Sequence, residues 1–339
     1  MFNRNVYKYD DMKRREHMAV RRTVGWYLFT HQLLEVTGKD AVPFLDKVFT
    51  GDIANLKVGR DRYTLMLDEQ AQIIGDVIIM HIDEGRYWIS TLFLTKLTAW
   101  LDAHKEGFDV AYENVTARYH MYAVQGPKSR ELVDAIAQDR VDNLKFFGIM
   151  DTVIDGVPVK INRAGFTGEE FGYEIYFAAD QIGKIEAQLK EKGAPLGAVE
   201  VTEFQIMAWT LPTEAGYYYM RDLMHTDPIE VGLEYAIDWD KDFIGKSALQ
   251  SIKDAGPARE MVGFTMDEDD ARVNAKDLGG PGTRVMLDGH EIGRVSKFNY
   301  SFLNEKNVGY LLVRKGTVKK GDHVAINDYD AIVTEKKFI

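Results

Sequence analysis

The chain has 339 residues, 45 % of them hydrophobic, and a formal net charge of −11 from 42 basic and 53 acidic residues. The length predicts about two domains on the rough guide of ~150 residues each, and the hydrophobic content excludes a disordered chain. The acidic balance argues against a nucleic-acid binder, and the lack of cysteine excludes disulfides, a thiolate nucleophile and cysteine-ligated metals.

The N-terminal segment, residues 1–16, lacks the apolar core of a signal peptide. No apolar run reaches the ~18 residues that a membrane span needs. Together with the lack of cysteine, this fits a cytoplasmic protein that contacts neither membrane nor nucleic acid.

The first 254 residues show strand and helix patterns with few βαβ alternations. Helical patterns cover 11–24, 40–49, 95–107, 127–138 and 180–193. Strand patterns lie at 25–38, at three places within 62–90, and at 118–126, 152–163 and 172–177. Runs of strands followed by a helix predict α+β sheets with helices on one face.

Near residue 255 the pattern changes to short strands only. Residues 256–260 have the composition of a linker, and 284–295 predict a hairpin because Asp288-Gly289 is a strong type I′ turn signal. Strand patterns at 308–313, 322–327 and 329–336 complete a small all-β unit of the barrel kind. We therefore predict a domain of residues 1–254, built of two interleaved α+β subdomains, and a β-barrel domain of residues 255–339.

Two patterns resemble a phosphate-binding loop and a metal site but lack residues that those sites need. Gly245-Lys246-Ser247 resembles the end of a phosphate-binding loop, but that motif needs a glycine where Asp240 stands. The eight histidines show no metal-ligand spacing, and the acidic run 267–270 is more typical of a solvated turn. We expect no metal site.

The stretch RAGFTGEEFGYEIYF, residues 163–177, joins a glycine-rich loop to a strand. Glu174 and Tyr173 point to opposite faces of that strand. Glu174 is either a solvent-facing residue on an edge strand or a carboxylate that binds a ligand. The loop supplies glycines where tight backbone geometry or the close approach of a ligand is useful: Gly165, Gly168 and Gly172.

Two further polar residues lie among apolar ones. Asp76 stands between QIIG and VIIMHI, so it is either a sheet-edge residue or a functional carboxylate in a low-dielectric place. His31, in YLFTHQLLEV, is either a hydrogen-bonded core residue or a functional group. The pattern alone leaves both alternatives open for each residue.

Taken in order along the chain, these stretches resemble the aminomethyltransferase family, typified by the glycine cleavage T-protein. The likeness covers about residues 11 to 315. The glycine-rich stretch with its glutamate is the most specific of the segments that carry it. Those segments are EHMAVRRTVGWYLFTHQLLEVTGKDA, RYTLMLDEQAQIIGDVII, VQGPKSREL, RAGFTGEEFGYEIYF, DPIEVGLEYAI and FIGKSAL.

The resemblance implies three subdomains arranged as a cloverleaf around a central hole, the last of them a small β-barrel. It also implies tetrahydrofolate as the cofactor, bound in that hole. Glu174 would accept two adjacent N–H donors from the pterin edge, with Tyr63 and the three glycines also binding the cofactor. Asp76 matches the family's acidic residue near the nitrogens that accept the one-carbon unit, and His31 is the second candidate catalytic residue.

The sequence departs from the family on the side of the one-carbon donor. The family's Asp-Val-Ser-His reads Leu-Phe-Thr-His at 28–31, its paired Asp-Asp reads Gly75-Asp76, and STLFL replaces its Asn-Ala-x-Asn segment. LPTEAGYYYMRD lacks the arginine of Arg-Leu-Glu-Ala-Gly, and the barrel's Ser-Gly signature reads VSKFNYS. RYWIS and the tyrosine run at 217–219 are more similar to the family's demethylase branch, which takes methyl groups from aryl methyl ethers or from sulfonium compounds such as dimethylsulfoniopropionate.

We therefore predict a tetrahydrofolate-dependent methyltransferase that takes a methyl group from a small O-methyl or S-methyl donor, with Tyr217 and Tyr218 binding the donor. One alternative is a glycine cleavage aminomethyltransferase that forms 5,10-methylenetetrahydrofolate. Another is a folate-binding accessory protein without transferase activity. The expected partner is a small molecule and not a carrier protein.

Overall fold

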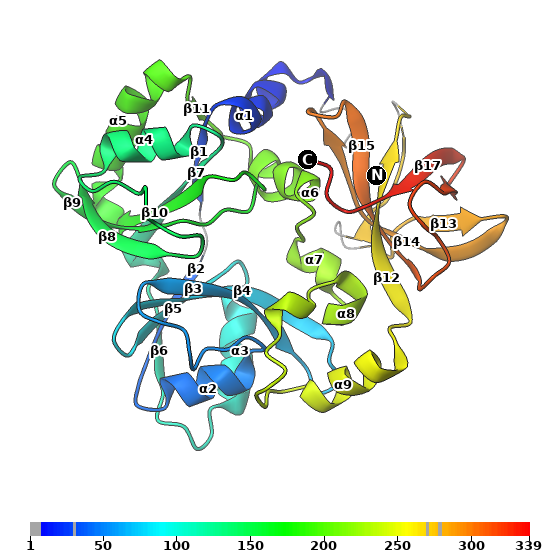
Figure 1. The fold of residues 1–339 in the computed structure, drawn as a ribbon, viewed down its shortest axis with the longest axis horizontal. Coiled ribbons are helices and arrows are strands. Elements are labelled where there is room, and N and C mark those ends of the chain that lie inside the picture. Colours follow the sequence, from blue (N-terminus) through cyan, green and yellow to red (C-terminus); the bar gives the residue numbers. More distant parts are fainter. Residues whose placement is uncertain (1–7, 30–31, 269–270, 277–279) are drawn as a thin grey trace.

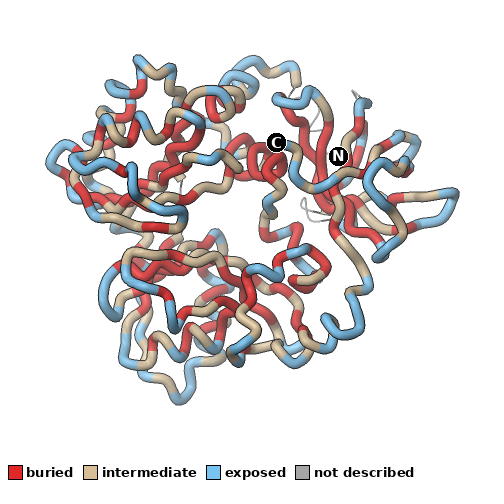
Figure 2. The backbone as a smooth tube through the Cα atoms, in the orientation of Figure 1, coloured by how far each residue is buried: buried red, intermediate tan, exposed pale blue. Residues whose placement is uncertain are grey.

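The computed structural model describes residues 8–29, 32–268, 271–276 and 280–339. It arranges them as two units of sheet and helix and one closed barrel around a common centre, as Figure 1 shows. The α+β architecture with a C-terminal barrel that the sequence predicts is confirmed. Buried backbone runs through each of the three units separately (Figure 2), so each unit has a core of its own.

The first unit is a six-stranded sheet in the order β11-β1-β7-β10-β9-β8. One face of this sheet packs against α4 and α5, where Leu132 and Ile185 meet Ile175 and Phe177 in a shared apolar core. The strands are β1 (Gly25–Phe29), β7 (Tyr119–Gln125), β8 (Ile149–Ile154), β9 (Val157–Asn162), β10 (Gly172–Ala178) and β11 (Val199–Glu200). The helices are α4 (Ser129–Ile136) and α5 (Ile182–Gly193).

The second unit is a five-stranded sheet in the order β3-β4-β5-β2-β6. Its outer face packs against two amphipathic helices, where Phe44 and Leu97 meet Val77 and Ile79. The strands are β2 (Gln32–Thr37), β3 (Arg60–Leu67), β4 (Ile73–Asp83), β5 (Arg86–Thr91) and β6 (Ala111–Asn114). The helices are α2 (Ala41–Val48) and α3 (Leu94–His104).

The chain passes between the two sheets within a few residues. The apolar pattern at 25–38 reads as strand throughout, yet β1 pairs with β7 and β11 in the first sheet, whereas β2 pairs with β5 and β6 in the second. The remaining faces of the two sheets meet in a third core, to which Met80 and Trp88 come from one sheet and Met121 and Tyr176 from the other.

The barrel closes in the order β12-β15-β14-β13-β16-β17. The predicted hairpin turn is confirmed, because Leu287 pairs with His290 and the two turn residues, Asp288 and Gly289, have φ of 50° and 78°. The strands are β12 (Arg259–Met266), β13 (Arg284–Leu287), β14 (His290–Ser301), β15 (Lys306–Arg314), β16 (His323–Ile326) and β17 (Tyr329–Thr334). The division of the chain at 254/255 stays a prediction.

Short helices connect the sheets to the barrel. Residues of α7 and α8 pack in one core with Leu65 of β3 and Leu312 of β15, so these helices join the second sheet to the barrel (Figure 1). The α-helices outside the two sheet units are α1 (Asp11–Arg22), α6 (Leu211–Glu214), α7 (Met220–Leu223), α8 (Pro228–Val231) and α9 (Lys246–Ala255). Among the described helices, none combines the length and apolar character that a membrane crossing requires.

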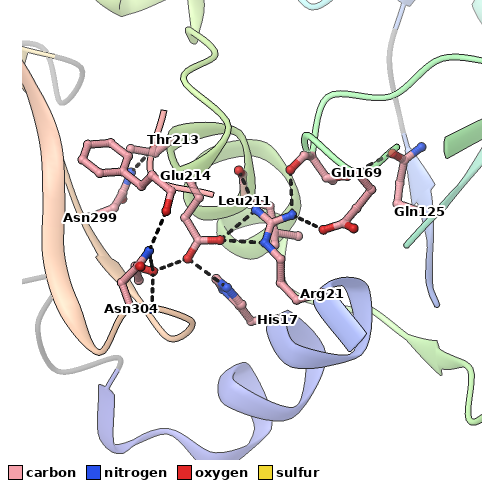
Figure 3. A network of polar contacts seen from close by, with 12 residues as sticks. His17, Arg21, Gln125, Glu169, Leu211, Thr213, Glu214, Asn299 and Asn304 are labelled. Atoms are coloured by element: carbon pink, nitrogen blue, oxygen red, sulfur yellow. Dashed lines mark hydrogen bonds and ion pairs between the residues drawn. The ribbon is translucent and has the colours of Figure 1, made fainter. Parts of the chain in front are cut away.

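A buried polar network joins α1, α6, the 163–171 loop and the barrel (Figure 3). Arg21 donates to Glu214 at 2.8 Å, to Glu169 at 2.5 Å and to the carbonyls of Thr167 and Leu211. Glu214 is wholly buried, and it also contacts His17 at 3.0 Å and accepts the hydroxyl of Ser301. Its pKa is lowered, because the charges of His17 and Arg21 outweigh the effect of burial. Each carboxylate oxygen of Glu214 therefore has a partner within the protein.

Candidate functional site

Glu174 lies on the inner face of the first sheet. Its strand, β10, is flanked by β7 and β9, so the edge-strand alternative is wrong. Tyr173 packs in the core beneath α4 and α5, and Glu174 points to the opposite face, toward the second sheet. The Glu174 Oε2 atom accepts the Tyr176 hydroxyl at 2.8 Å and the Asn162 side-chain amide at 3.5 Å. Burial raises the pKa of Glu174, although these two donors oppose the shift.

Asp61 of β3 completes this cluster. The Asn162 amide donates to its Oδ2 atom at 2.5 Å, and Asn162 in turn pairs with Glu174 across the sheet. Burial, with the charge of Glu174 beside it, raises the pKa of Asp61 to about 7. The second carboxylate oxygen of Asp61 and the amide oxygen of Asn162 are buried and have no hydrogen-bond partner among the residues that the structure describes. Two acceptors are thus available to a ligand that brings N–H or O–H donors.

Asp76 forms a second carboxylate site on β4. It lies on the same face as Tyr63, whose hydroxyl donates to Asp76 Oδ2 at 3.2 Å. Burial raises the pKa of Asp76 to about 6, against the opposing effects of the Tyr63 hydrogen bond and the charge of Lys297. β4 is flanked by β3 and β5, so Asp76 is not on an edge strand.

The strand β3 connects the two carboxylate sites. Asp61 and Tyr63 are two residues apart on this strand and therefore share a face, with Cα atoms roughly 7 Å apart. At one end of this face Asp61 meets Asn162 and Glu174 of the first sheet, and at the other end lies the Tyr63–Asp76 pair. Carboxylates kept from water next to unused acceptors suit a ligand with several N–H donors along its length.

A buried lysine from the barrel acts on Asp76 through its charge. The Lys297 ammonium of β14 lies 2.7 Å from the carboxylate of Asp222 of α7, and both side chains are wholly buried. Its charge is close enough to lower the pKa of Asp76. The sequence held one signal for this residue, because Lys297 occurs in VSKFNYS, where the family's barrel signature has glycine after serine.

The tyrosines of 217–219 lie next to this region. Tyr218 donates its hydroxyl proton to the carbonyl of Val231 at 2.6 Å and accepts from Lys336. Burial lowers the pKa of Lys336 to about 8. Tyr217 is 41 % exposed, and Tyr235, 73 % exposed, stacks against Tyr63 at a centroid distance of 6.2 Å. The roles of Tyr217 and Tyr218 in donor binding stay predictions.

The three loop glycines have a packing reason in the structure. A Cβ on Gly165 or Gly172 would come within 2.1 Å or 2.4 Å of the Gln125 side-chain oxygen. Gly168 has φ of 88°, and a Cβ there would come within 2.4 Å of the Ala215 Cβ. The neighbours that require glycine are thus protein atoms, and cofactor contact by these residues stays a prediction.

The structure does not test every residue that the sequence singles out. His31 lies outside the described residues, so its catalytic role stays a prediction. Asp61 and Asn162 were missed, because only the fold brings these two residues together, 101 positions apart in the sequence. Among the described residues, no group of three or more His, Asp and Glu side chains is arranged to hold a metal ion.

Comparisons with known proteins agree along nearly the whole chain. The model of the GCVT N-terminal domain matches residues 2–241, and that of the glycine cleavage T-protein C-terminal barrel domain matches 259–339. The chain is 33 % identical to the aminomethyltransferase of Herpetosiphon aurantiacus, covering 95 % of this chain and 86 % of the relative. It is 29 % identical to the aminomethyltransferase of Thermotoga maritima, covering 95 % and 88 %.

A solved structure shares the fold. The crystal structure of glycine cleavage system aminomethyltransferase T from Bartonella henselae superposes with a TM-score of 0.82. The match covers 96 % of this chain and 89 % of that one, at 24 % identity. The cloverleaf that the resemblance implies is therefore the fold of this protein.

Proposed function

The chain belongs to the glycine cleavage T-protein family of tetrahydrofolate-dependent one-carbon transferases, and from this premise we propose that it moves a methyl group from a small O-methyl or S-methyl donor to tetrahydrofolate. The observation that carries the proposal is a contrast within one region. The carboxylates Glu174 and Asp76 are present, whereas the residues expected around the donor are replaced, as at Lys297.

The described residues fit the cofactor. A pterin ring presents adjacent N–H donors, and the unused oxygens of Asp61 and Asn162 lie beside Glu174, buried and without partners among the described residues. The charge on Asp61 and Glu174 strengthens such hydrogen bonds. This cluster would hold the pterin edge, and Tyr63 and Asp76 would lie further along the same face.

When bound, tetrahydrofolate supplies a nitrogen nucleophile that takes the methyl group, while the electrons of the broken bond leave with the donor. Asp76 would accept the proton that this nitrogen gives up, since a carboxylate with a pKa of about 6 is ionised at neutral pH and still basic enough to hold a proton. The Tyr63 hydroxyl fixes the orientation of Asp76 through its hydrogen bond. Positioning of the two reactants supplies much of the remaining rate.

Of the two donor classes, the geometry favours a sulfonium. A phenolate leaving group needs a proton donor or charge stabilisation, and the hydroxyls of Tyr218 and Tyr63 already donate, to Val231 and to Asp76. A sulfonium leaves as a neutral thioether and needs no acid. The faces of Tyr63 and Tyr235 suit its positive charge by cation–π contact.

The second candidate is an aminomethyltransferase, because the relatives from Herpetosiphon aurantiacus and Thermotoga maritima carry that name. Incubation of the protein with tetrahydrofolate and one donor at a time distinguishes the two, with mass spectrometry of the folate product. The donors are dimethylsulfoniopropionate, an aryl methyl ether and the aminomethylated lipoyl carrier protein. We expect 5-methyltetrahydrofolate from a methyl donor and no turnover of the carrier protein. Formation of 5,10-methylenetetrahydrofolate from the carrier protein alone would refute the proposal.

A further inference from the structure

A cavity of about 810 Å³ lies between the barrel and the segment that contains α7. Its wall includes Arg221 of α7 and parts of β12, β14 and β15. Residues next to each other in the sequence face different sites. Arg221 and Ser296 line this cavity. The residues that follow them, Asp222 and Lys297, pair with each other instead, and the charge of Lys297 acts on Asp76. The cavity is therefore a site separate from the carboxylate cluster.

The lining of this cavity is strongly basic in a chain whose net charge is −11. Among the described lining residues there is one acidic side chain, that of Glu291. The cationic side chains are Arg221, Arg259, Lys276, Arg294 and Arg314. This local excess of positive charge raises the concentration of small anions at the cavity.

The protein neutralises only part of this charge. Arg259 makes a two-pronged pair with Glu230, at 2.7 Å and 2.8 Å, and Arg294 pairs with Glu291 at 2.9 Å. Lys276 and Arg314 instead donate to main-chain carbonyls, Lys276 to those of Met224 and Asp222, and Arg314 to that of Glu291 at 3.0 Å. A carbonyl satisfies a donor but leaves its charge in place, so both cations remain available to an anion.

A buried hydroxyl points to a ligand independently of the charges. Ser296 is 1 % exposed and lines the cavity. Its Oγ atom has no hydrogen-bond partner among the residues that the structure describes. Buried hydroxyls are normally hydrogen-bonded, and an anionic oxygen would accept this one.

From these observations we propose that the cavity binds a small molecule with two or more carboxylate or phosphate groups, held by Lys276, Arg314 and Ser296. The number of cations calls for more than one anionic group, and the apolar side chains of Ile292 and Leu312 leave room for a hydrocarbon body. Such a ligand has two possible sources. It is either a free polyanion or the oligoglutamate tail of a folate whose ring lies elsewhere.

Calorimetry with inorganic tripolyphosphate and with citrate tests the site on the whole chain. We expect saturable binding that weakens as sodium chloride is raised. The double variant Lys276→Gln/Arg314→Gln should lower the affinity at least tenfold. The control, Lys39→Gln, removes an exposed lysine that pairs with Asp109 and should leave the affinity unchanged. Equal affinity in the double variant and the control, or no saturable binding of either probe, would overturn the proposal.

The variant Ser296→Ala keeps the test valid if the double variant folds poorly. Because this hydroxyl has no partner among the described residues, its loss should leave the melting temperature unchanged and still weaken tripolyphosphate about threefold or more. An unchanged affinity in a folded Ser296→Ala protein would contradict the role of Ser296 in the site.

Two folates distinguish the sources. If tetrahydrofolate with five glutamates binds more tightly than the monoglutamate, and this gain disappears in the double variant, the ligand is the tail. If the tail brings no gain while tripolyphosphate binds, the ligand is a free polyanion. Monoglutamate binding itself should be equal in all variants, so a failure of the proposed one-carbon transfer is seen separately from a failure of this site.

Discussion

Two of the buried acidic groups in the molecule differ in how far the protein satisfies them. Around Glu214, Arg21 supplies opposite charge, His17 lies 3.0 Å from one carboxylate oxygen, Ser301 supplies a hydroxyl, and the pKa of the carboxyl is lowered (Figure 3). Around Asp61 and Glu174 the donors are an amide and phenol, and both pKa values are raised by burial.

This difference separates a structural cluster from the cluster that we propose binds the cofactor. Burying a carboxylate costs several kcal/mol unless opposite charge and hydrogen bonds offset the loss of water. The Glu214 network meets that condition and joins α1, α6 and the barrel. The Asp61 cluster does not meet it, and we propose that a bound ligand supplies the missing donors. Perturbed carboxylates of this kind are typical of functional sites.

The largest expected effect is the loss of the Glu214 network. Glu214→Gln leaves Arg21 and His17 buried with one acidic partner fewer, and breaking a buried charged pair costs ~3–5 kcal/mol. Urea unfolding should show a lower free energy of unfolding by this amount. Glu305→Gln is the control, because Glu305 pairs with Arg14 at the surface at 2.8 Å, and exposed pairs contribute ~0–1 kcal/mol. Equal stability of the two variants would show that the network is not structural.

The next effect concerns catalysis. Asp76→Asn keeps the shape of the side chain and removes the base, so we expect kcat to fall ~10²-fold, the scale of a general acid–base group. In the wild-type protein the rate should rise with pH through about 6, as Asp76 ionises, and this limb should be absent from Asp76→Asn. Single-turnover rates within twofold of wild type would show that Asp76 is structural.

Features that depend on neighbouring residues in the sequence could be predicted from it. Alternation on β10 placed Glu174 opposite the core residue Tyr173, and the Asp288-Gly289 turn was predicted from its type. These features depend on neighbours in the sequence. The apolar surroundings singled out Asp76 and the resemblance added Tyr63, and the structure brings these two side chains into hydrogen-bond contact.

The features that were missed depend on contacts across the fold. Asp61 and Asn162 are 101 residues apart, and neither stands out from its neighbours in the sequence. Lys297 was seen only as a changed signature, because its partner Asp222 comes from a different unit. For the three loop glycines the sequence allowed two explanations, contact with a ligand or close packing within the protein. The structure shows close packing, because a Cβ at these positions would collide with Gln125 or Ala215.

A smaller effect is expected on the stability of the ligand-free protein. The pKa of Asp61 is about 7 in the folded protein, against an ordinary value of 3.8, so folding favours the protonated carboxyl. The stability that this preference adds is complete below pH 3.8 or so and is lost as the pH rises through about 7. This difference in pKa corresponds to ~4 kcal/mol of folding free energy at most, and we expect ~2 kcal/mol once the surroundings relax. Asp61→Asn should therefore be more stable than wild type at pH 8 in urea unfolding, and less so at pH 4. The exposed Asp151→Asn is the control and should show no such pH dependence.

The smallest effect tests the binding cluster at its most specific residue. Glu174→Gln keeps the size of the side chain but replaces one acceptor by an NH₂ group, which would face a ligand donor. A buried group left unsatisfied costs ~1–3 kcal/mol, so tetrahydrofolate affinity should fall at least tenfold, since ~1.4 kcal/mol corresponds to a factor of ten. The melting temperature without ligand should not fall, because the hydrogen bond from Tyr176 can be kept by the remaining oxygen.

Glu174→Ala sharpens this last test. The smaller side chain lets water enter and satisfy the ligand's donors, so its loss of affinity should be less than that of Glu174→Gln. Calorimetry with tetrahydrofolate on both variants measures the order. If Glu174→Gln binds as tightly as wild type, the raised pKa of this carboxyl reflects burial alone. The pterin edge would then have to be bound by Asp61 and Asn162, whose unused oxygens lie in the same cluster.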